Sequence, residues 1–254
     1  MSTNRQRPFA LCHSESAISA AVDEKGFWCE ISAPFTQARH MPISKAAVRY
    51  LYYYGCVFKV TARVVDDTST VWRQIDDEYG GKGFFVRAEH IRPIPPAEFT
   101  PISPAVPMEE KHMEVDPAKQ TASAYEGHNP VISARVTTGA SFRLADGIVR
   151  NFGTTPGTHR IHMKLPSQPM VCGAARDNDD YDLPRIVWVS YFTSTGIVFH
   201  GTDRQNVDGT PRCHGCVNML PEDAKRVFLW TRQLLRMKSV AFALISGQGY
   251  VTKW

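Results

Sequence analysis

The chain has 254 residues, of which 43% are hydrophobic and 21% are charged, as is typical of globular proteins. It contains no run near the roughly 20 apolar residues that a membrane-spanning helix needs, and residues 1–16 lack the continuous apolar segment of an intact secretory signal. The net charge of +4 is too small to indicate nucleic-acid binding; it suits an anionic substrate, although a solvated surface explains it equally well.

The N-terminal half is predicted to be a leader followed by a small β-barrel. Residues 1–42 show no clear period, so we assign no structure to this leader. Between residues 43 and 95, apolar and polar residues alternate in short runs separated by turns rich in Gly and Asp. Short strands with tight turns favour a barrel, and the segment resembles the bacterial SH3-like domains found beside cell-wall enzymes. Residues 96–109 are rich in proline, which predicts a semi-rigid linker and an independently folding domain after it.

Residues 110–254 are predicted to form a second, mostly β domain with one amphipathic helix. Two apolar runs over residues 186–200 are split by a turn, which predicts a hairpin that ends at His200. The helix is expected to begin at Pro221, which suits the first helical position, and apolar residues recur at helical spacing as far as Leu235. A last apolar run near residues 240–246 predicts a buried strand.

The segment from His200 to Cys216 carries the residue types of a reactive site. A thiol is strongly nucleophilic only as a thiolate, so Cys216 needs a base nearby, and His200 is the candidate. Gly215 removes side-chain bulk beside the thiol and lets backbone N–H groups converge on an oxyanion. Two other interpretations stay open at this point: a C-x-x-C redox pair formed by Cys213 and Cys216, and a zinc site that adds His200 and His214.

The same segment resembles the signature of the L,D-transpeptidase catalytic domain family. That signature is a His-Gly pair, a loop, and then Ser/Thr-His-Gly-Cys-hydrophobic-Asn/Arg. The matching residues here are His200-Gly201, followed after a loop by Cys213-His214-Gly215-Cys216-Val217-Asn218. The resemblance extends over residues 110–254, so it implies a β-sandwich domain of this family behind the SH3-like barrel.

The resemblance implies a cysteine acyltransferase that cross-links peptidoglycan. Cys216 would attack the carbonyl between the third and fourth residues of a stem tetrapeptide, and D-Ala would leave. The side-chain amine of a neighbouring stem would then accept the acyl group. His200 would act as the base, with its ring oriented by the Gly201 carbonyl, and backbone N–H groups around His214, Gly215 and Cys216 would stabilise the oxyanion.

The resemblance also implies the surroundings of this site. Asn218, Tyr181 and Trp188 would contact the substrate, and neither a metal nor another cofactor is expected. The expected partners are peptidoglycan stem peptides, with carbapenem-type β-lactams as covalent inhibitors and without nucleic acid. The expected location is extracytoplasmic, in the cell wall or periplasm.

Two departures from the family pattern leave an alternative open. Cys213 stands where the family has Ser or Thr, and the loop at residues 203–208 lacks the aromatic residue and histidine that are usual there. The alternative is a non-catalytic protein that binds peptidoglycan through its SH3-like domain and a degenerate transpeptidase domain. The intact pair of Cys216 and His200 favours the enzyme.

Overall fold

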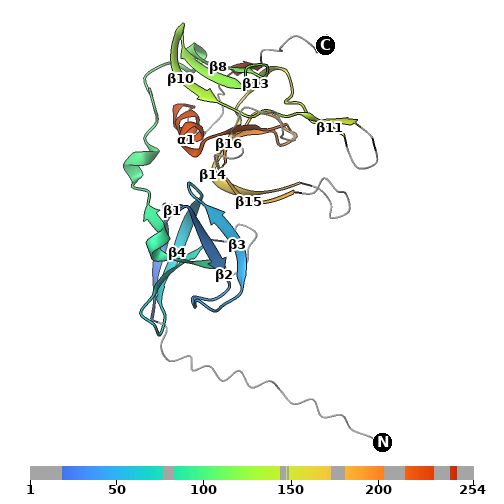
Figure 1. Ribbon diagram of the computed structural model, residues 1–254. Helices are drawn as coiled ribbons and strands as arrows, with labels where there is room; N and C mark the ends of the chain where they lie inside the picture. Colours follow the sequence, from blue (N-terminus) through green and yellow to red (C-terminus); the bar gives the residue numbers. More distant parts are fainter. Residues whose placement is uncertain are drawn as a thin grey trace, which may run out of the picture.

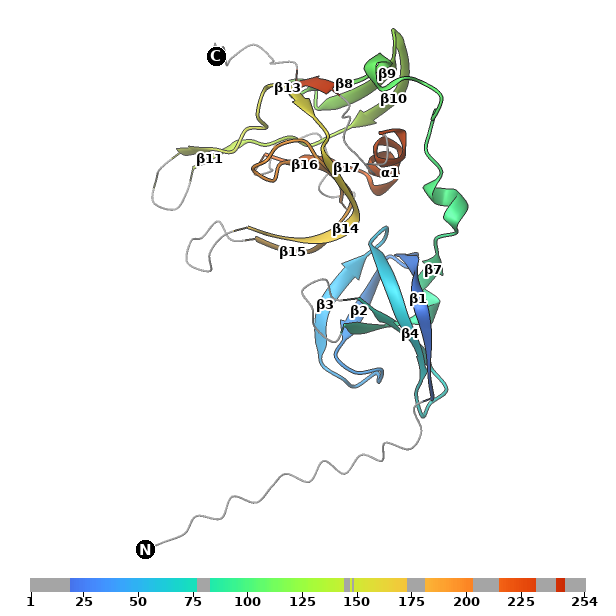
Figure 2. The same cartoon turned by 180° about the vertical axis from the view of Figure 1, so that it is seen from behind.

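The computed structural model describes residues 19–76, 83–143, 147, 149–172, 181–202, 215–231 and 241–244. Strands predominate, and one α-helix is present in this part of the chain (Figures 1 and 2). The expected mainly β fold class is therefore confirmed. No helix among the described residues is long and apolar enough to cross a membrane.

The N-terminal half forms one antiparallel sheet. Its strands are β1 (Ser19–Ile31), β2 (Phe35–Arg39), β3 (Val48–Tyr53), β4 (Val57–Val65), β5 (Val71–Ile75), β6 (Phe84–Arg87) and β7 (Ile91–Pro93). Their order in the sheet is β3-β2-β6-β5-β4-β1-β7, and within the described residues the end strands β3 and β7 each have one hydrogen-bonded neighbour. Among the described residues the sheet is curved but open, so the expected small barrel is not closed (Figure 1).

This sheet begins earlier in the chain than the sequence analysis places it. Strands β1 and β2 precede residue 43, and β1 pairs with β4 along most of its length. The alternation expected in the middle of the segment is present, because buried and more exposed side chains alternate from Phe58 to Val65. One face of β4 therefore packs into the core, as the period of two requires.

The proline-rich connection contains 3-10 turns and is attached to the C-terminal half. Its turns are η3 (Pro96–Phe99) and η4 (Met108–Glu110), whereas η2 (Ala88–His90) lies earlier, between β6 and β7. The Ile102 amide donates to the Leu229 carbonyl at 3.0 Å. The buried Lys111 ammonium donates to the carbonyls of Ile102 and Ser103 at 3.1 and 2.8 Å, and to that of Trp230 at 3.1 Å. These bonds hold the connection against the following half.

The C-terminal half contains two main sheets and a two-stranded ribbon. The first sheet, in the order β10-β9-β8-β18-β13, consists of β10 (Asn129–Arg135), β9 (Thr121–Glu126), β8 (Lys111–Asp116), β18 (Ala241–Leu244) and β13 (Gly157–Arg160). The ribbon pairs β11 (Ser141–Arg143) with β12 (Val149–Asn151). The second sheet, in the order β14-β15-β16-β17, consists of β14 (Met163–Cys172), β15 (Tyr181–Tyr191), β16 (Val198–Gly201) and β17 (Val217–Met219).

Helix α1 (Pro221–Trp230) covers one face of the second sheet and contacts β15 and β16 (Figure 1). It begins at Pro221 as expected, and Leu220 precedes it without a side-chain cap. Ala224, Val227 and Phe228 are buried, so the apolar stripe faces the sheet. The expected extension of the apolar spacing to Leu235 lies outside the described residues.

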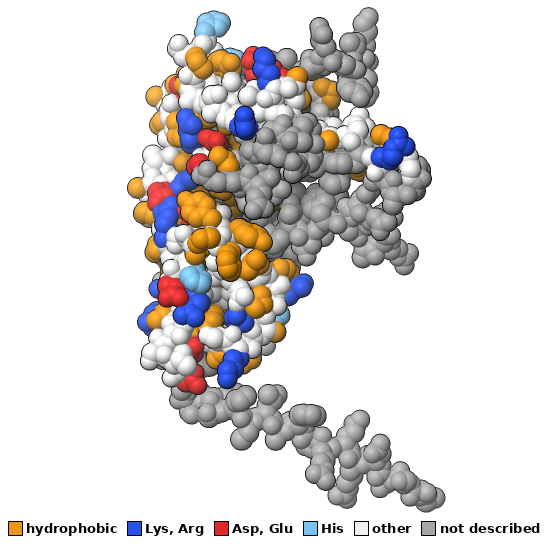
Figure 3. All heavy atoms as spheres, viewed as in Figure 1, with side chains coloured by type: hydrophobic (Ala, Val, Ile, Leu, Met, Phe, Trp, Pro, Cys, Tyr) orange, Lys and Arg blue, Asp and Glu red, His pale blue; other side chains and the backbone are white. Residues whose placement is uncertain are grey.

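The two halves share one hydrophobic core. A single cluster of buried residues runs from the N-terminal sheet into the C-terminal half. The rings of Phe99 and Trp188 lie 5.8 Å apart, and the Arg185 guanidinium lies 4.3 Å from the centre of the Phe58 ring. Figure 3 shows apolar side chains gathered where the two halves meet. The linker therefore does not separate two independent cores, contrary to what its composition predicts.

Ion pairs reinforce this junction. Glu98 in η3 accepts hydrogen bonds from Arg92 at 2.7 Å and from Lys225 of α1 at 2.5 Å, and Arg92 also pairs with Glu30 of β1. The hydrogen bond from Arg92, followed by that from Lys225, lowers the pKa of Glu98 to about 2. The network links β1, the connection and α1.

Candidate active site

Strands β16 and β17 run parallel, and their register sets His200 opposite Asn218. Side chains at alternate positions of a strand share a face, so His200 lies on the same face as Val198. Cys216 and Val198 belong to one small buried apolar cluster that also contains Ile186 and Val189 of β15. His200, Asn218 and Cys216 therefore lie on one side of the second sheet, which we call the His200 face; α1 covers the opposite side.

His200 is a buried and neutral base. Its side chain is 2% exposed, and Nδ1 lies 3.2 Å from the Gly201 carbonyl oxygen. A carbonyl only accepts hydrogen bonds, so Nδ1 carries the ring proton and Nε2 is unprotonated. Burial lowers the pKa of His200 to about 4, against the smaller opposing effects of the Gly201 carbonyl and the Asn218 side chain. At neutral pH the imidazole can therefore accept a proton.

Gly201 is fixed by the start of α1. A Cβ atom at this position would lie 2.7 Å from Val187 Cγ2 and 2.9 Å from Pro221 Cα, so only glycine fits without displacement. The next amide, of Thr202, donates to the Met219 carbonyl at 2.9 Å. Helix α1 and strand β17 thus hold the carbonyl that orients His200.

The turn before Cys216 packs against a segment that sequence reasoning did not single out for the site. Gly215 has a φ of +110°, a backbone conformation that glycine adopts easily. A Cβ atom on Gly139 would lie 2.0 Å from the Phe152 carbonyl oxygen and 2.8 Å from the Gly215 nitrogen. The sequence signal for this close approach is the glycine that follows Thr137 and Thr138.

Thr137 joins the same segment to Asn218. The two residues form an isolated antiparallel bridge, with hydrogen bonds of 3.0 Å from the Thr137 amide and 2.9 Å from the Asn218 amide. Thr137 is fully buried and Asn218 is 8% exposed. The Thr137 hydroxyl and the Asn218 side-chain oxygen are both buried and find no hydrogen-bond partner among the described residues.

Cys216, His200, Gly201, Gly215 and Asn218 all lie on β16, on β17 or in the turn before β17, but not every residue expected at the site lies there. Trp188 is 1% exposed and lies on the α1 side of the sheet, where its ring centre is 5.2 Å from that of Phe228. It is a core residue at the junction of the two halves, so the expected substrate contact is not supported by its position.

The remaining expected residues are only partly described. Tyr181 begins β15 opposite Cys172, and its side chain lies outside the described part of the structure. His214, Cys213 and the loop at residues 203–208 also lie outside the described residues. The redox and zinc interpretations depend on Cys213, so their geometry is not described either. Within the described ranges, no group of three or more His, Cys, Asp or Glu side chains is arranged to hold a metal ion.

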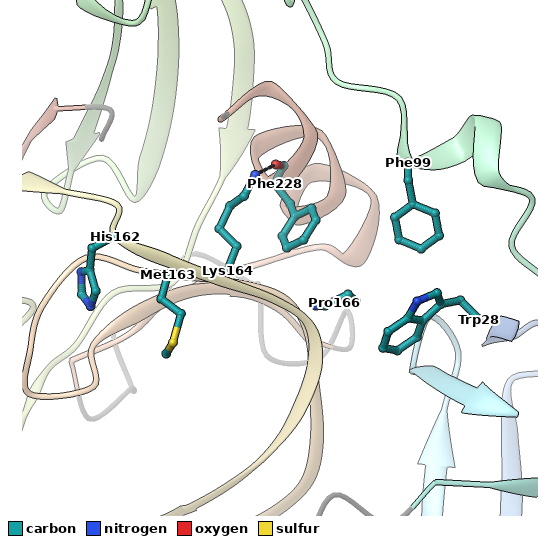
Figure 4. Close-up of a pocket in the computed structure, with 7 residues that line it drawn as sticks. All are labelled: Trp28, Phe99, His162, Met163, Lys164, Pro166 and Phe228. Carbon is teal, nitrogen blue, oxygen red and sulfur yellow. Dashed lines mark hydrogen bonds between the residues drawn. The ribbon is translucent and has the colours of Figure 1, made fainter. Parts of the chain in front are cut away.

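A cavity of about 420 Å³ lies away from the His200 face, between the N-terminal sheet and α1 (Figure 4). None of the expected site residues that the structure describes lines this cavity. Lys164 crosses it toward the end of α1, and its ammonium donates to the carbonyls of Phe228 and Thr231 at 2.5 Å each and to the Thr231 hydroxyl at 3.2 Å. With its donors engaged in this way, Lys164 supports the helix. The lining residues are Trp28, Phe99, His162, Met163, Lys164, Pro166 and Phe228.

Solved structures of L,D-transpeptidases are similar to this chain at low identity. The carbamoyl enzyme of Ldtfm with avibactam is 17% identical and matches 55% of this chain and 50% of that chain, with a TM-score of 0.42. An L,D-transpeptidase from Mycobacterium smegmatis is 15% identical over 91% of this chain and 82% of that chain, with a TM-score of 0.43. An L,D-transpeptidase from Stackebrandtia nassauensis is 19% identical over 54% of this chain and 56% of that chain, with a TM-score of 0.39. The chain thus spans about half the length of the first and third.

The assignment to a family rests on the sequence match. No curated protein matches the chain. The family described as the L,D-transpeptidase catalytic domain (YkuD) matches residues 110–238, which include the His200 face and α1. This match covers just over half of the 254 residues, and it confirms the resemblance of the His200–Asn218 segment. The chain therefore belongs to the L,D-transpeptidase catalytic domain family.

Proposed function

We propose that the protein transfers acyl groups through a thioester on Cys216, with His200 as the general base. The observation that carries this proposal is the shared face. The His200 imidazole is neutral and carries its single ring proton on Nδ1, which faces the Gly201 carbonyl. This imidazole lies on the same face as the Cys216 thiol. Membership of the L,D-transpeptidase family supplies the reaction class.

The proposed donor is a peptidoglycan stem tetrapeptide. Cys216 Sγ forms a bond to the carbonyl carbon between the third and fourth residues, while its proton passes to His200 Nε2. The C–N bond then breaks, and the imidazolium gives this proton to the departing D-Ala amine. An amine of a neighbouring stem next attacks the thioester. His200 takes the proton of that amine and returns it to the Cys216 thiolate as the new amide forms.

The low pKa of His200 favours a particular form of this mechanism. Because burial holds the imidazole neutral, the resting pair is a thiol beside an imidazole, not a preformed ion pair. Proton transfer would then accompany the attack on the carbonyl. Backbone N–H groups at Gly215 and Cys216 are the proposed donors to the oxyanion, since the positive φ of Gly215 lets successive amides converge.

The proposed setting follows from the family and not from the geometry. The substrate class places the reaction in the cell wall or periplasm, with stem peptides as partners. Carbapenem-type β-lactams, which acylate by presenting a strained amide, are the proposed covalent inhibitors. We also propose that the N-terminal sheet attaches the protein to the cell wall, as its resemblance to SH3-like domains suggests.

Mass spectrometry of the intact protein after incubation with imipenem tests the proposal. The wild type should gain the mass of one carbapenem, and peptide mapping should place it on Cys216. Cys216→Ala should gain nothing and should retain the wild-type melting temperature, because one small buried residue replaces another. Release of D-Ala from a tetrapeptide donor should follow the same pattern. An adduct or D-Ala release that persists in Cys216→Ala would overturn the nucleophile, and an unreactive wild type would favour the non-catalytic alternative.

A further inference from the structure

Three side chains form a row across the His200 face. Thr137 and Asn218 exchange two backbone hydrogen bonds, and residues paired in this way point to the same side. Asn218 is in turn the register partner of His200 on β16. The row therefore runs from Thr137 through Asn218 to His200.

The first two members of the row carry complementary unpaired atoms. Within the part of the chain that the structure describes, the Thr137 hydroxyl and the Asn218 Oδ1 atom are each buried without a hydrogen-bond partner. A hydroxyl can donate, whereas an amide oxygen can only accept. Unpaired buried polar atoms are rare in folded proteins because each costs free energy, and they cluster at functional sites. A hydrogen bond between these two atoms would satisfy both.

The last two members of the row are already coupled. The Asn218 side chain raises the pKa of His200, against the larger lowering by burial. It thus favours the protonated imidazole that forms when His200 takes a proton. An amide can exert this effect only while it keeps its orientation, because its oxygen and nitrogen have opposite hydrogen-bonding roles.

We propose that Thr137 is a positioning residue, whose hydroxyl donates to Asn218 Oδ1 and holds the Asn218 amide beside His200. The catalytic consequence rests on the proposed function, in which His200 accepts the Cys216 proton. Thr137 touches neither the thiol nor the acyl group in this account. It acts through Asn218, so removal of its hydroxyl should matter only while the Asn218 amide is present.

Two neighbouring threonines provide a matched comparison. Thr138 is as deeply buried as Thr137, but its hydroxyl accepts a hydrogen bond of 2.6 Å from Gln120. Thr137→Val removes the hydroxyl that we propose bonds to Asn218 Oδ1, so it should lower the melting temperature by about 2–6 °C and also slow acylation by imipenem about five- to tenfold. Thr138→Val breaks a buried hydrogen bond and should lower the melting temperature by about 2–6 °C without slowing acylation. Thr137→Ser, which keeps the hydroxyl, should acylate at close to the wild-type rate.

A double-mutant cycle decides whether Thr137 acts through Asn218. Asn218→Ala should slow acylation, and adding Thr137→Val to it should cause no further loss. Losses that multiply would overturn the proposal, as would equal rates for Thr137→Val and wild type. The ¹⁵N signals of the His200 ring at pH 7 provide a readout that needs no activity. They should shift in Thr137→Val and not in Thr138→Val, even if the wild type proved unreactive and the proposed function failed. Unchanged His200 signals in Thr137→Val would equally overturn the positioning role.

Discussion

The burial of His200 predicts how the stability of the protein depends on pH. Folding lowers the pKa of this imidazole from 6.5 to about 4, chiefly because the charged form loses its solvation. Between these two values the unfolded chain binds a proton that the folded chain does not. The stability contributed by the neutral imidazole is therefore complete above pH 6.5, is lost as the pH falls toward 4, and changes no further below that.

The size of the effect follows from the two pKa values. One pKa unit corresponds to about 1.4 kcal/mol, so His200 should destabilise the fold by about 3 kcal/mol between pH 6.5 and pH 4. The assay is urea denaturation at half-unit steps of pH, with the free energy of unfolding taken at each step. His200→Gln is the matched variant, because glutamine is uncharged throughout this range and similar in length. The difference between the two curves isolates His200 from the other titrating groups.

The two proteins should therefore diverge on acidification. The wild type should lose about 3 kcal/mol more than His200→Gln across the window, and their curves should run parallel above pH 7. Curves that stay parallel down to pH 4 would refute the reasoning. They would mean that His200 is solvated in the folded protein, and the neutral thiol–imidazole pair would lose its physical basis.

Two further predictions concern the packing around the site. Deletion of residues 1–109 uncovers Trp188 and Phe228, so the shortened protein should show no cooperative thermal transition by circular dichroism. A sharp transition near the wild-type temperature would show that the second half folds alone. Gly139→Ala forces a methyl group onto the backbone beside Gly215 and should cost about 1–3 kcal/mol and slow imipenem acylation. An unchanged melting temperature and acylation rate in this variant would contradict the close packing.

The elements with an unbroken period were predictable from the sequence. Strand β4 shows the alternation that its residues indicate, and α1 begins at the proline expected to start it. The first strand of the protein escaped prediction for a physical reason. Its pairing with β4 shifts register between Val22 and Phe27, and Gly26 within this interval has a φ of +56°. Such a bulge breaks the period of two on which strand prediction depends.

The same kind of irregularity explains why Trp188 faces the core. Strand β15 shifts register relative to β16 between Val187 and Ser190, and Trp188 within this interval has a φ of +53°. Regular alternation would predict a face for Trp188 from its neighbours, but the shift turns it toward α1, where Phe99 and Phe228 bury it. In contrast, His200 and Asn218 lie on regular strands, so their shared face could be expected once the strands were paired. The pairing of β16 with β17 could not be predicted, because nothing in the residues of either strand indicates its partner across the loop between them.

The junction between the halves also bears on the site through α1. The helix starts against Gly201, whose carbonyl orients His200. A Cβ atom on Gly55, in the turn between β3 and β4, would lie 2.9 Å from Pro221 Cβ. Lys225, on the same helix, pairs with Glu98 of the connection. The first residue of α1 is thus held between the N-terminal sheet and the residue that fixes the imidazole. A displacement of the N-terminal half would reach His200 through that contact, so the His200 segment and the preceding sheet are packed as one unit despite the proline-rich sequence between them.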